Sequence, residues 1–146
     1  MGVSARDLVT TVFLDRGAVL LAQPDEQRRR PPSWVPLPGM TEQIEHLTEV
    51  GIDVTIIAAE VPDEIREALP TLTLVDELPS NPPADSWLVT TDPAWCERPR
   101  PAGLHTILIG PRKTPGPRRS TYCDIVARDL SAAVMDILTR QVMGTV

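Results

Sequence analysis

One short segment near the start of the chain, the apolar run Leu8–Leu14 followed by Asp15, constrains the fold most strongly. The run is β-rich and stops at a single acid, and the small-residue turn Arg16-Gly17-Ala18 comes directly after it. This pattern is typical of a buried parallel strand that presents the acid at its carboxyl end, the edge where open α/β sheets bind their ligands. Asp15 is therefore a candidate site residue. The plain alternative is that its carboxylate only caps the following turn.

Apolar, strand-like runs alternate with helical segments along the rest of the chain. The spacing predicts helices over residues 40–50, 63–69 and 129–142, the first capped by Thr41 and stopped by Gly51. Further strands are expected at residues 53–60, 71–78, 86–92, 105–110 and 124–126, and a short broken helix at 93–101. Such alternation predicts a mostly parallel α/β sheet with helices on both faces, a three-layer α/β/α Rossmann-like arrangement in a single domain over residues 1–146.

Two proline-rich, polar segments, residues 22–38 and 111–120, are expected to be irregular loops on this domain. The first carries Arg28, Arg29 and Arg30, and the second carries Arg112 in a basic stretch. Guanidinium groups near the carboxyl end of a strand would attract phosphate, so these four arginines are candidate substrate-binding residues. The alternative for both segments is a solvated loop without a ligand.

Composition and charge narrow the classes of partner. The chain has 146 residues, and its net charge of −6 favours neither nucleic acid nor an anionic membrane as a partner. No stretch approaches the ~20 apolar residues of a membrane span, and we see no secretory signal. The two cysteines, Cys96 and Cys123, lack metal-ligand spacing, so a reduced, cytoplasmic setting is expected. The oligomeric state is left open.

A second strand-like run, SWLVTTD, also ends in an acid, Asp92. Neighbouring parallel strands place their carboxyl ends side by side, so Asp15 and Asp92 are expected to approach each other. Two carboxylates, together with water and a substrate phosphate, suit Mg²⁺. Asp15 could also attack a phosphoryl group as a carboxylate nucleophile.

Four collinear segments resemble the haloacid dehalogenase-like phosphatase superfamily. VFLDRGAVL is similar to its first motif, an apolar strand followed by D-x-D-G-V/T-L. The segment from RRRPPSWVPLPG to DVTIIAAE resembles the passage to the second motif in the histidinol-phosphate and heptose-bisphosphate phosphatase branch. ADSWLVTTDPAW through AGLHTILIG resembles the fourth motif region, and YCDIVARDLSAAVMDIL the terminal strand and helix. The resemblance implies a haloacid dehalogenase-like fold without a sizeable cap domain.

The resemblance also assigns expected roles, of which several lack the required side chain. Asp15 matches the nucleophile and Asp92 the metal-binding acid, so Mg²⁺ is the implied cofactor. The general acid/base position falls on Gly17, and the phosphate-binding Thr or Ser position falls on Ala58. The motif lysine has no match, although an arginine of the 28–30 cluster or Arg112 could replace it.

Around the fourth motif the sequence departs further from the family pattern. Thr91 stands where a glycine is usual, and Cys96 where a second acid is common.

Three functional hypotheses follow from these residues. The first is a degenerate phosphatase-like domain that has lost phosphoryl transfer, or nearly so, and acts by binding a protein partner or a phosphorylated small molecule. The alternative is an active Mg²⁺-dependent phosphohydrolase that uses Asp15 as nucleophile on a small phosphomonoester. The third is an unrelated α/β binding module in which Asp15 and Asp92 are caps.

Overall fold

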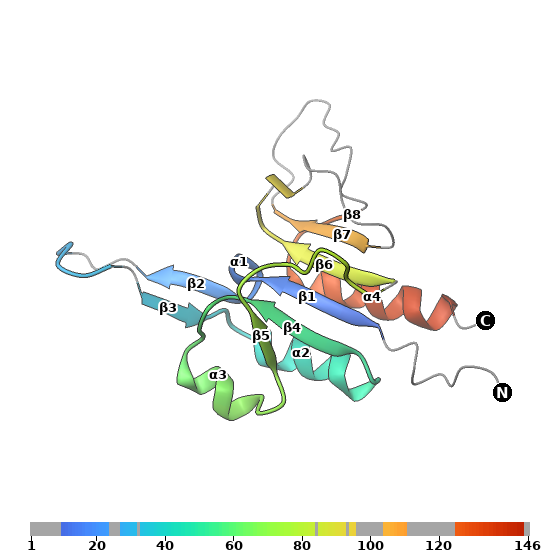
Figure 1. Cartoon of the computed structure of the whole chain (residues 1–146), viewed down its shortest axis with the longest axis horizontal. Coiled ribbons are helices and arrows are strands. Elements are labelled where there is room, and N and C mark those ends of the chain that lie inside the picture. Colours follow the sequence, from blue (N-terminus) through green and yellow to red (C-terminus); the bar gives the residue numbers. More distant parts are fainter. Residues whose placement is uncertain are drawn as a thin grey trace.

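A six-stranded parallel sheet forms the centre of the protein (Figure 1). The computed structural model describes residues 10–23, 27–31, 33–83, 85–92, 94–95, 104–110 and 125–144. The strand order is β5-β4-β1-β6-β7-β8, and every neighbouring pair is parallel. The strands are β1 (Thr11–Asp15), β4 (Asp53–Ile57), β5 (Thr73–Val75), β6 (Ser86–Thr90), β7 (Leu104–Ile109) and β8 (Ile125–Ala127). The expected mostly parallel, Rossmann-like α/β fold is confirmed, and no large cap is present in the described part of the chain.

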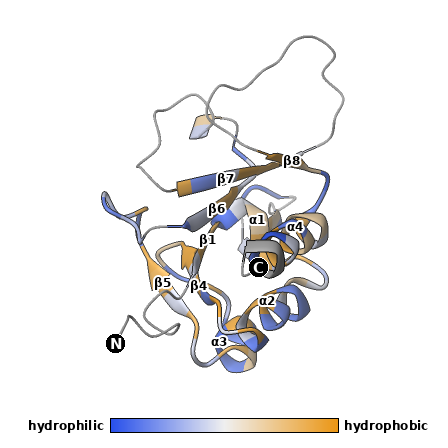
Figure 2. Cartoon of the chain, turned by 90° about the vertical axis from the view of Figure 1, so that its right-hand side faces the viewer, coloured by the Kyte–Doolittle hydropathy of each residue, from blue (hydrophilic) through white to orange (hydrophobic). Residues whose placement is uncertain are grey.

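The three longer helices pack on one face of this sheet (Figure 2). They are α2 (Met40–Glu49), α3 (Asp63–Ala68) and α4 (Leu130–Gly144). Their buried residues, such as Ile44, Ile65 and Ile137, join Val12 and Leu14 of β1 in one core cluster. The core on this face therefore fixes the position of β1, with β4 on one side of it and β6 on the other.

The start and end of the helices follow from local sequence. Gly51, with φ of 86°, takes the left-handed conformation after α2 that side-chain-bearing residues avoid, which confirms the predicted stop. Asp129 caps α4, since its Oδ1 accepts from the N–H of Ala132 at 2.8 Å. The prediction that Thr41 caps α2 is wrong, because the cap residue is Gly39 and no side-chain hydrogen bond caps the helix.

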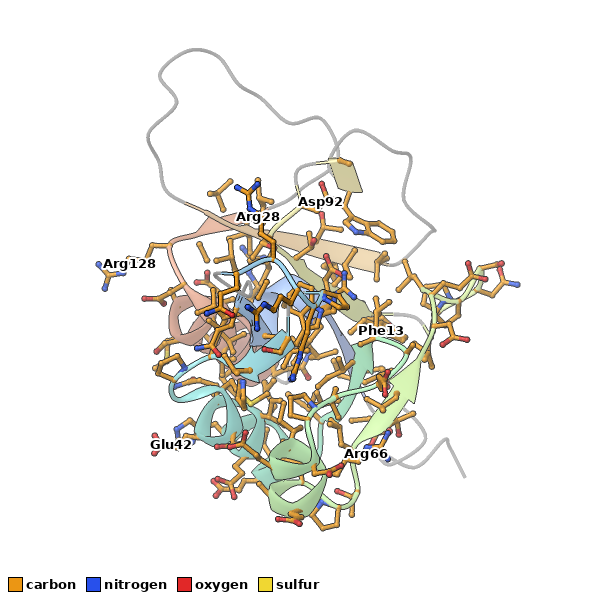
Figure 3. All side chains as sticks on the ribbon, turned by 90° about the vertical axis from the view of Figure 1, so that its left-hand side faces the viewer. Phe13, Arg28, Glu42, Arg66, Asp92 and Arg128 are labelled. Atoms are coloured by element: carbon orange, nitrogen blue, oxygen red, sulfur yellow. The ribbon has the colours of Figure 1, made fainter. Side chains whose placement is uncertain are left out.

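A smaller core lies on the second face of the sheet. Phe13, Ile57, Leu88 and Leu104 form a smaller buried cluster there, with Leu78 and Trp95 packed against it. Phe13 points to the side of the sheet away from α2 and α4 (Figure 3). In the described part of the chain these residues come from strands and connecting segments, and Trp95 lies in a short 3₁₀ turn. The described residues between β5 and β6 form no helix, because this connection is rich in proline, which interrupts helices.

The segment that was expected to be an irregular loop, residues 22–38, contains most of a β-hairpin. After a single helical turn, α1 (Arg16–Val19), the chain forms β2 (Leu20–Gln23), which pairs antiparallel with β3 (Ser33–Pro36). The N–H of Leu37 donates to the carbonyl of Val19 at 2.9 Å, which closes the base of the hairpin. Figure 1 shows the hairpin projecting beyond the carboxyl ends of the strands.

Some sequence predictions fall on residues outside the described part. These are the loop 111–120, Cys96, Cys123 and most of the expected helix 93–101. No helix in the described ranges is long and apolar enough to cross a membrane.

Candidate functional site

Asp15 lies at the carboxyl end of the central strand, as the sequence predicts. The register pairs Asp15 with Ile57 of β4 and pairs Leu14 with Val89 of β6, so that Thr90 comes level with Asp15. The structure thus brings the ends of β1, β4 and β6 together. Ala58 follows directly after β4, and Asp92 is the second residue after β6.

The hydroxyl of Thr90 links the two acidic positions. It donates to Oδ2 of Asp15 at 2.7 Å and accepts from the N–H of Asp92 at 3.0 Å. Thr90 is fully buried, so this link is shielded from solvent. The other carboxylate oxygen of Asp15, Oδ1, accepts from the N–H of Arg16 at 2.9 Å. Hydrogen bonds therefore fix the Asp15 carboxylate from two sides.

Asp92 lies exposed at the start of the next turn. Its Oδ1 accepts from the N–H of Ala94 at 2.9 Å, so the carboxylate caps its own turn. Asp15 and Asp92 thus both make the contacts expected of carboxylates that cap the following turn. Each carboxylate nevertheless keeps lone pairs for a further partner, because an ionised carboxylate has about four acceptor sites.

Gly17, at the position assigned to the acid/base, is in close contact with the neighbouring strand end. A Cβ atom on Gly17 would lie within 3.0 Å of Oγ1 of Thr91, closer than real Cβ atoms come to any heavy atom. The Thr91 Cβ and Cγ2 atoms would lie at 3.6 and 3.9 Å, which are ordinary contact distances. Only the Thr91 hydroxyl therefore conflicts with a side chain at position 17.

Ala58, at the assigned phosphate-binding position, is held in the sheet. Its N–H donates to the carbonyl of Val75 at 2.9 Å, and its side chain is 7 % exposed. The methyl group at this strand end has no hydrogen to donate to a phosphate oxygen.

Sequence reasoning did not single out Arg16, which the structure places beside Asp15. The Arg16 guanidinium lies over the ring of Trp34, 4.1 Å from its centroid, and Arg16 is exposed. Trp34 on β3 packs against the main core, so the hairpin supplies a supported ring under the arginine. The only sequence signal was a basic residue directly after the strand-end acid. Its aromatic partner lies eighteen residues further on, and only the folded hairpin brings the two together.

The arginine cluster that was predicted to contact the ligand lies elsewhere. Arg28, Arg29 and Arg30 are exposed on the outer part of the hairpin, which Figure 1 shows well beyond the strand ends. The structure therefore does not bring this cluster to Asp15. Arg112 lies outside the described residues, so its predicted role stays a prediction.

The donor set for a divalent cation is small. In the described ranges no group of three or more His, Cys, Asp or Glu side chains is arranged to hold a metal ion. Asp15 and Asp92 supply two carboxylates, which is the number that Mg²⁺ commonly takes from a protein when water and substrate phosphate complete its shell. The chemistry of this pair of carboxylates therefore fits Mg²⁺.

The strand order and the helices that cover the sheet define the class of structure, a Rossmann-like α/β fold. Comparison with solved structures bears this out. The chain is similar to a putative β-phosphoglucomutase from Bacteroides vulgatus, with 10% sequence identity, TM-score 0.57, and coverage of 92% of this chain and 89% of that one. It is also similar to D,D-heptose 1,7-bisphosphate phosphatase from Burkholderia thailandensis, with 23% identity, TM-score 0.51, and coverage of 89% and 99%.

A third similar structure is an uncharacterized protein from Listeria monocytogenes serotype 4b, with 16% identity, TM-score 0.52, and coverage of 91% of this chain and 99% of that one. No protein-family model and no curated protein matches the chain. At these identities the comparisons establish the fold, and they confirm the haloacid dehalogenase-like fold that the sequence motifs implied.

Proposed function

We propose that this chain is a phosphatase-fold domain that has lost phosphoryl transfer, or nearly so, and that its strand-end site binds a phosphorylated small molecule. The observation that carries the first part is that glycine occupies position 17, to which the family resemblance assigns the general acid/base. Residue 17 has no side chain, and the neighbouring positions 58 and 91 hold an alanine and a threonine. General acid–base catalysis is supplied by His, Asp, Glu, Lys, Tyr or Cys, and its loss costs about 10²–10⁴-fold in rate.

Arg16 supports the second part of the proposal. A guanidinium that stacks on an aromatic ring uses its flat face, and its N–H donors lie in the plane and can bind two oxygens of a phosphate. Stacking on Trp34 also restricts the side chain before a ligand arrives. We infer that Arg16 supplies the positive charge that the missing motif lysine would otherwise bring. The two carboxylates nearby disfavour an anion, which makes a compensating cation essential.

Mg²⁺ is the second source of positive charge in this proposal. Asp15 and Asp92 would hold the ion, and it would neutralise their charge and coordinate a phosphate oxygen. The same pair of acids supports the runner-up function, a Mg²⁺-dependent phosphohydrolase with Asp15 as the nucleophile. Measurement of turnover separates the two functions, because binding alone releases no product.

A protein partner is the other ligand class for this domain. The projecting hairpin favours it, because the three exposed arginines 28–30 and the half-exposed Leu21 lie on this one element. Such a surface fits a partner with an acidic patch. Removing the outer hairpin tests this candidate separately from the strand-end site.

Calorimetric titration with inorganic phosphate, at low ionic strength and with and without Mg²⁺, tests the small-molecule proposal. Arg16→Ala should weaken phosphate binding about tenfold or more, because a charge-assisted hydrogen bond contributes ~1.5–3 kcal/mol. Arg16→Lys should recover only part of the loss, since lysine neither stacks nor binds two oxygens in the same way. Arg66→Ala, on the exposed side of α3, is the matched control and should bind like the wild type. Equal affinity in Arg16→Ala and wild type would overturn the role of Arg16.

A further inference from the structure

Gly17 is a glycine because a neighbouring side chain leaves no room for a Cβ atom, whereas Gly39 and Gly51 are glycines because of their backbone conformation. Gly39 and Gly51 have φ angles of 79° and 86°, and a Cβ on either would meet no atom within 4 Å. Gly17 is the reverse case, since it lies in the helical turn α1 without a positive φ. Its backbone would accept any L-residue, and only the Thr91 hydroxyl stands in the way.

Thr91 is held against Gly17 by its neighbour. The buried hydroxyl of Thr90 is bonded to Oδ2 of Asp15 and to the N–H of Asp92, so the chain on both sides of Thr91 is tied to the end of β1. The backbone at Thr91 therefore cannot move away from α1 without breaking these bonds. Relief has to come from rotation of the Thr91 side chain about χ1.

Rotation offers only one way out. The three staggered positions on the Thr91 Cβ carry Oγ1, Cγ2 and a hydrogen. Turning the side chain one step brings the methyl group to the place of Oγ1 and keeps the conflict. Turning it the other way brings the hydrogen there, which relieves the conflict and moves both larger groups.

We propose that Gly17 and Thr91 form a complementary pair that closes the acid/base position. The Thr91 side chain takes the room that a side chain at position 17 needs, so a residue larger than glycine fits there without displacing Thr91 only when residue 91 is made smaller. This inference rests on the proposed function in one respect, the assignment of position 17 as the acid/base position. It predicts that restoring the acid with Gly17→Asp alone strains the site, and that Gly17→Asp needs Thr91→Ala beside it.

A double-mutant cycle in thermal unfolding tests the pair without any assay of activity. Gly17→Ala should lower Tm by about 3–9 °C, the range expected for forcing a methyl group into filled space. The same substitution should cost less than half as much in a Thr91→Ala background, where Oγ1 is absent. It should keep its full cost in a Thr91→Val background, since valine keeps the shape of threonine.

Gly110→Ala is the control for replacing a glycine as such. A Cβ on Gly110 would meet no atom within 4 Å and its φ is not positive, so Tm should stay within about 2 °C of wild type. An equal loss of Tm for Gly17→Ala in all three backgrounds, or no loss in any, would overturn the proposal. Turnover of a phosphomonoester by the wild-type chain would instead overturn the proposed function. It would not change the measured coupling of Gly17 and Thr91, so the two proposals fail separately.

Discussion

At the scale of single residues, Thr90 is the group that organises the strand-end site. Its buried hydroxyl makes both a donor bond to Asp15 and an acceptor bond from the backbone of Asp92. The two acids are therefore held in place by a residue that carries no charge and takes no part in the motif chemistry. Threonine is also common in strands for its β propensity alone, so its presence there did not indicate this role.

Thr90→Val should destabilise the protein by roughly 1–3 kcal/mol, because it removes a bond to a charged acceptor and leaves the N–H of Asp92 without its partner. Valine keeps the shape of the side chain, so the loss reports hydrogen bonding rather than packing. Urea denaturation measures the change as a shift of midpoint at constant slope.

The control is Thr91→Val at the exposed neighbouring position, which should stay within about 0.5 kcal/mol of wild type. Equal effects of the two substitutions would contradict the role assigned to Thr90.

The residue scale also shows where sequence reasoning succeeds. Asp15 and Asp92 were placed at neighbouring strand ends from apolar runs that stop at an acid, and the parallel pairing of β1 with β6 confirms that placement. Gly17 and Ala58 were assigned by motif, and the structure adds what surrounds them. Arg16 and Trp34 could not be paired in advance, because their contact depends on the fold of the hairpin.

At the scale of elements, the local sequence predicts helix α2 but not the hairpin, and the two segments show why. Helix α2 has Ile44 and Leu47 at helical spacing and Gly51 after its end, so local sequence defines it. The hairpin strands are only four residues long, and β3 ends in a proline. They are stabilised by contacts outside the segment's local pattern, such as the bond from Leu37 to Val19 and the packing of Trp34 against the core.

Replacing residues 24–32 by Asn-Gly tests what the outer hairpin contributes. Gln23 pairs with Ser33, so a two-residue Asn-Gly turn fits the antiparallel register. The shortened protein should keep its Tm within about 3 °C and its affinity for phosphate, because Arg28–Arg30 lie away from Asp15. Calorimetric titration of the shortened chain with phosphate is the measurement. A tenfold loss of affinity would assign the phosphate contact to the arginine cluster and contradict the assignment to Arg16.

At the scale of the whole molecule, the described helices lie on one face of the parallel sheet. The alternation of apolar strand-like runs with helical segments correctly predicted the parallel sheet, because buried parallel strands need apolar residues on both faces. The pattern could not show that the described residues between β5 and β6, and residues 91–92 directly after β6, form turns and loops rather than helices. These connections carry Asp92 and Thr91, so the irregular part of the fold forms half of the site.

Turnover of p-nitrophenyl phosphate with Mg²⁺ measures whether the whole molecule still acts as a phosphatase. The wild type should release product at or close to the rate of Asp15→Asn, since the acid/base position is Gly17 and the loss of such a group lowers the rate by ~10²–10⁴-fold. Mg²⁺-dependent turnover by the wild type that disappears in Asp15→Asn would contradict the account and establish the chain as a phosphohydrolase.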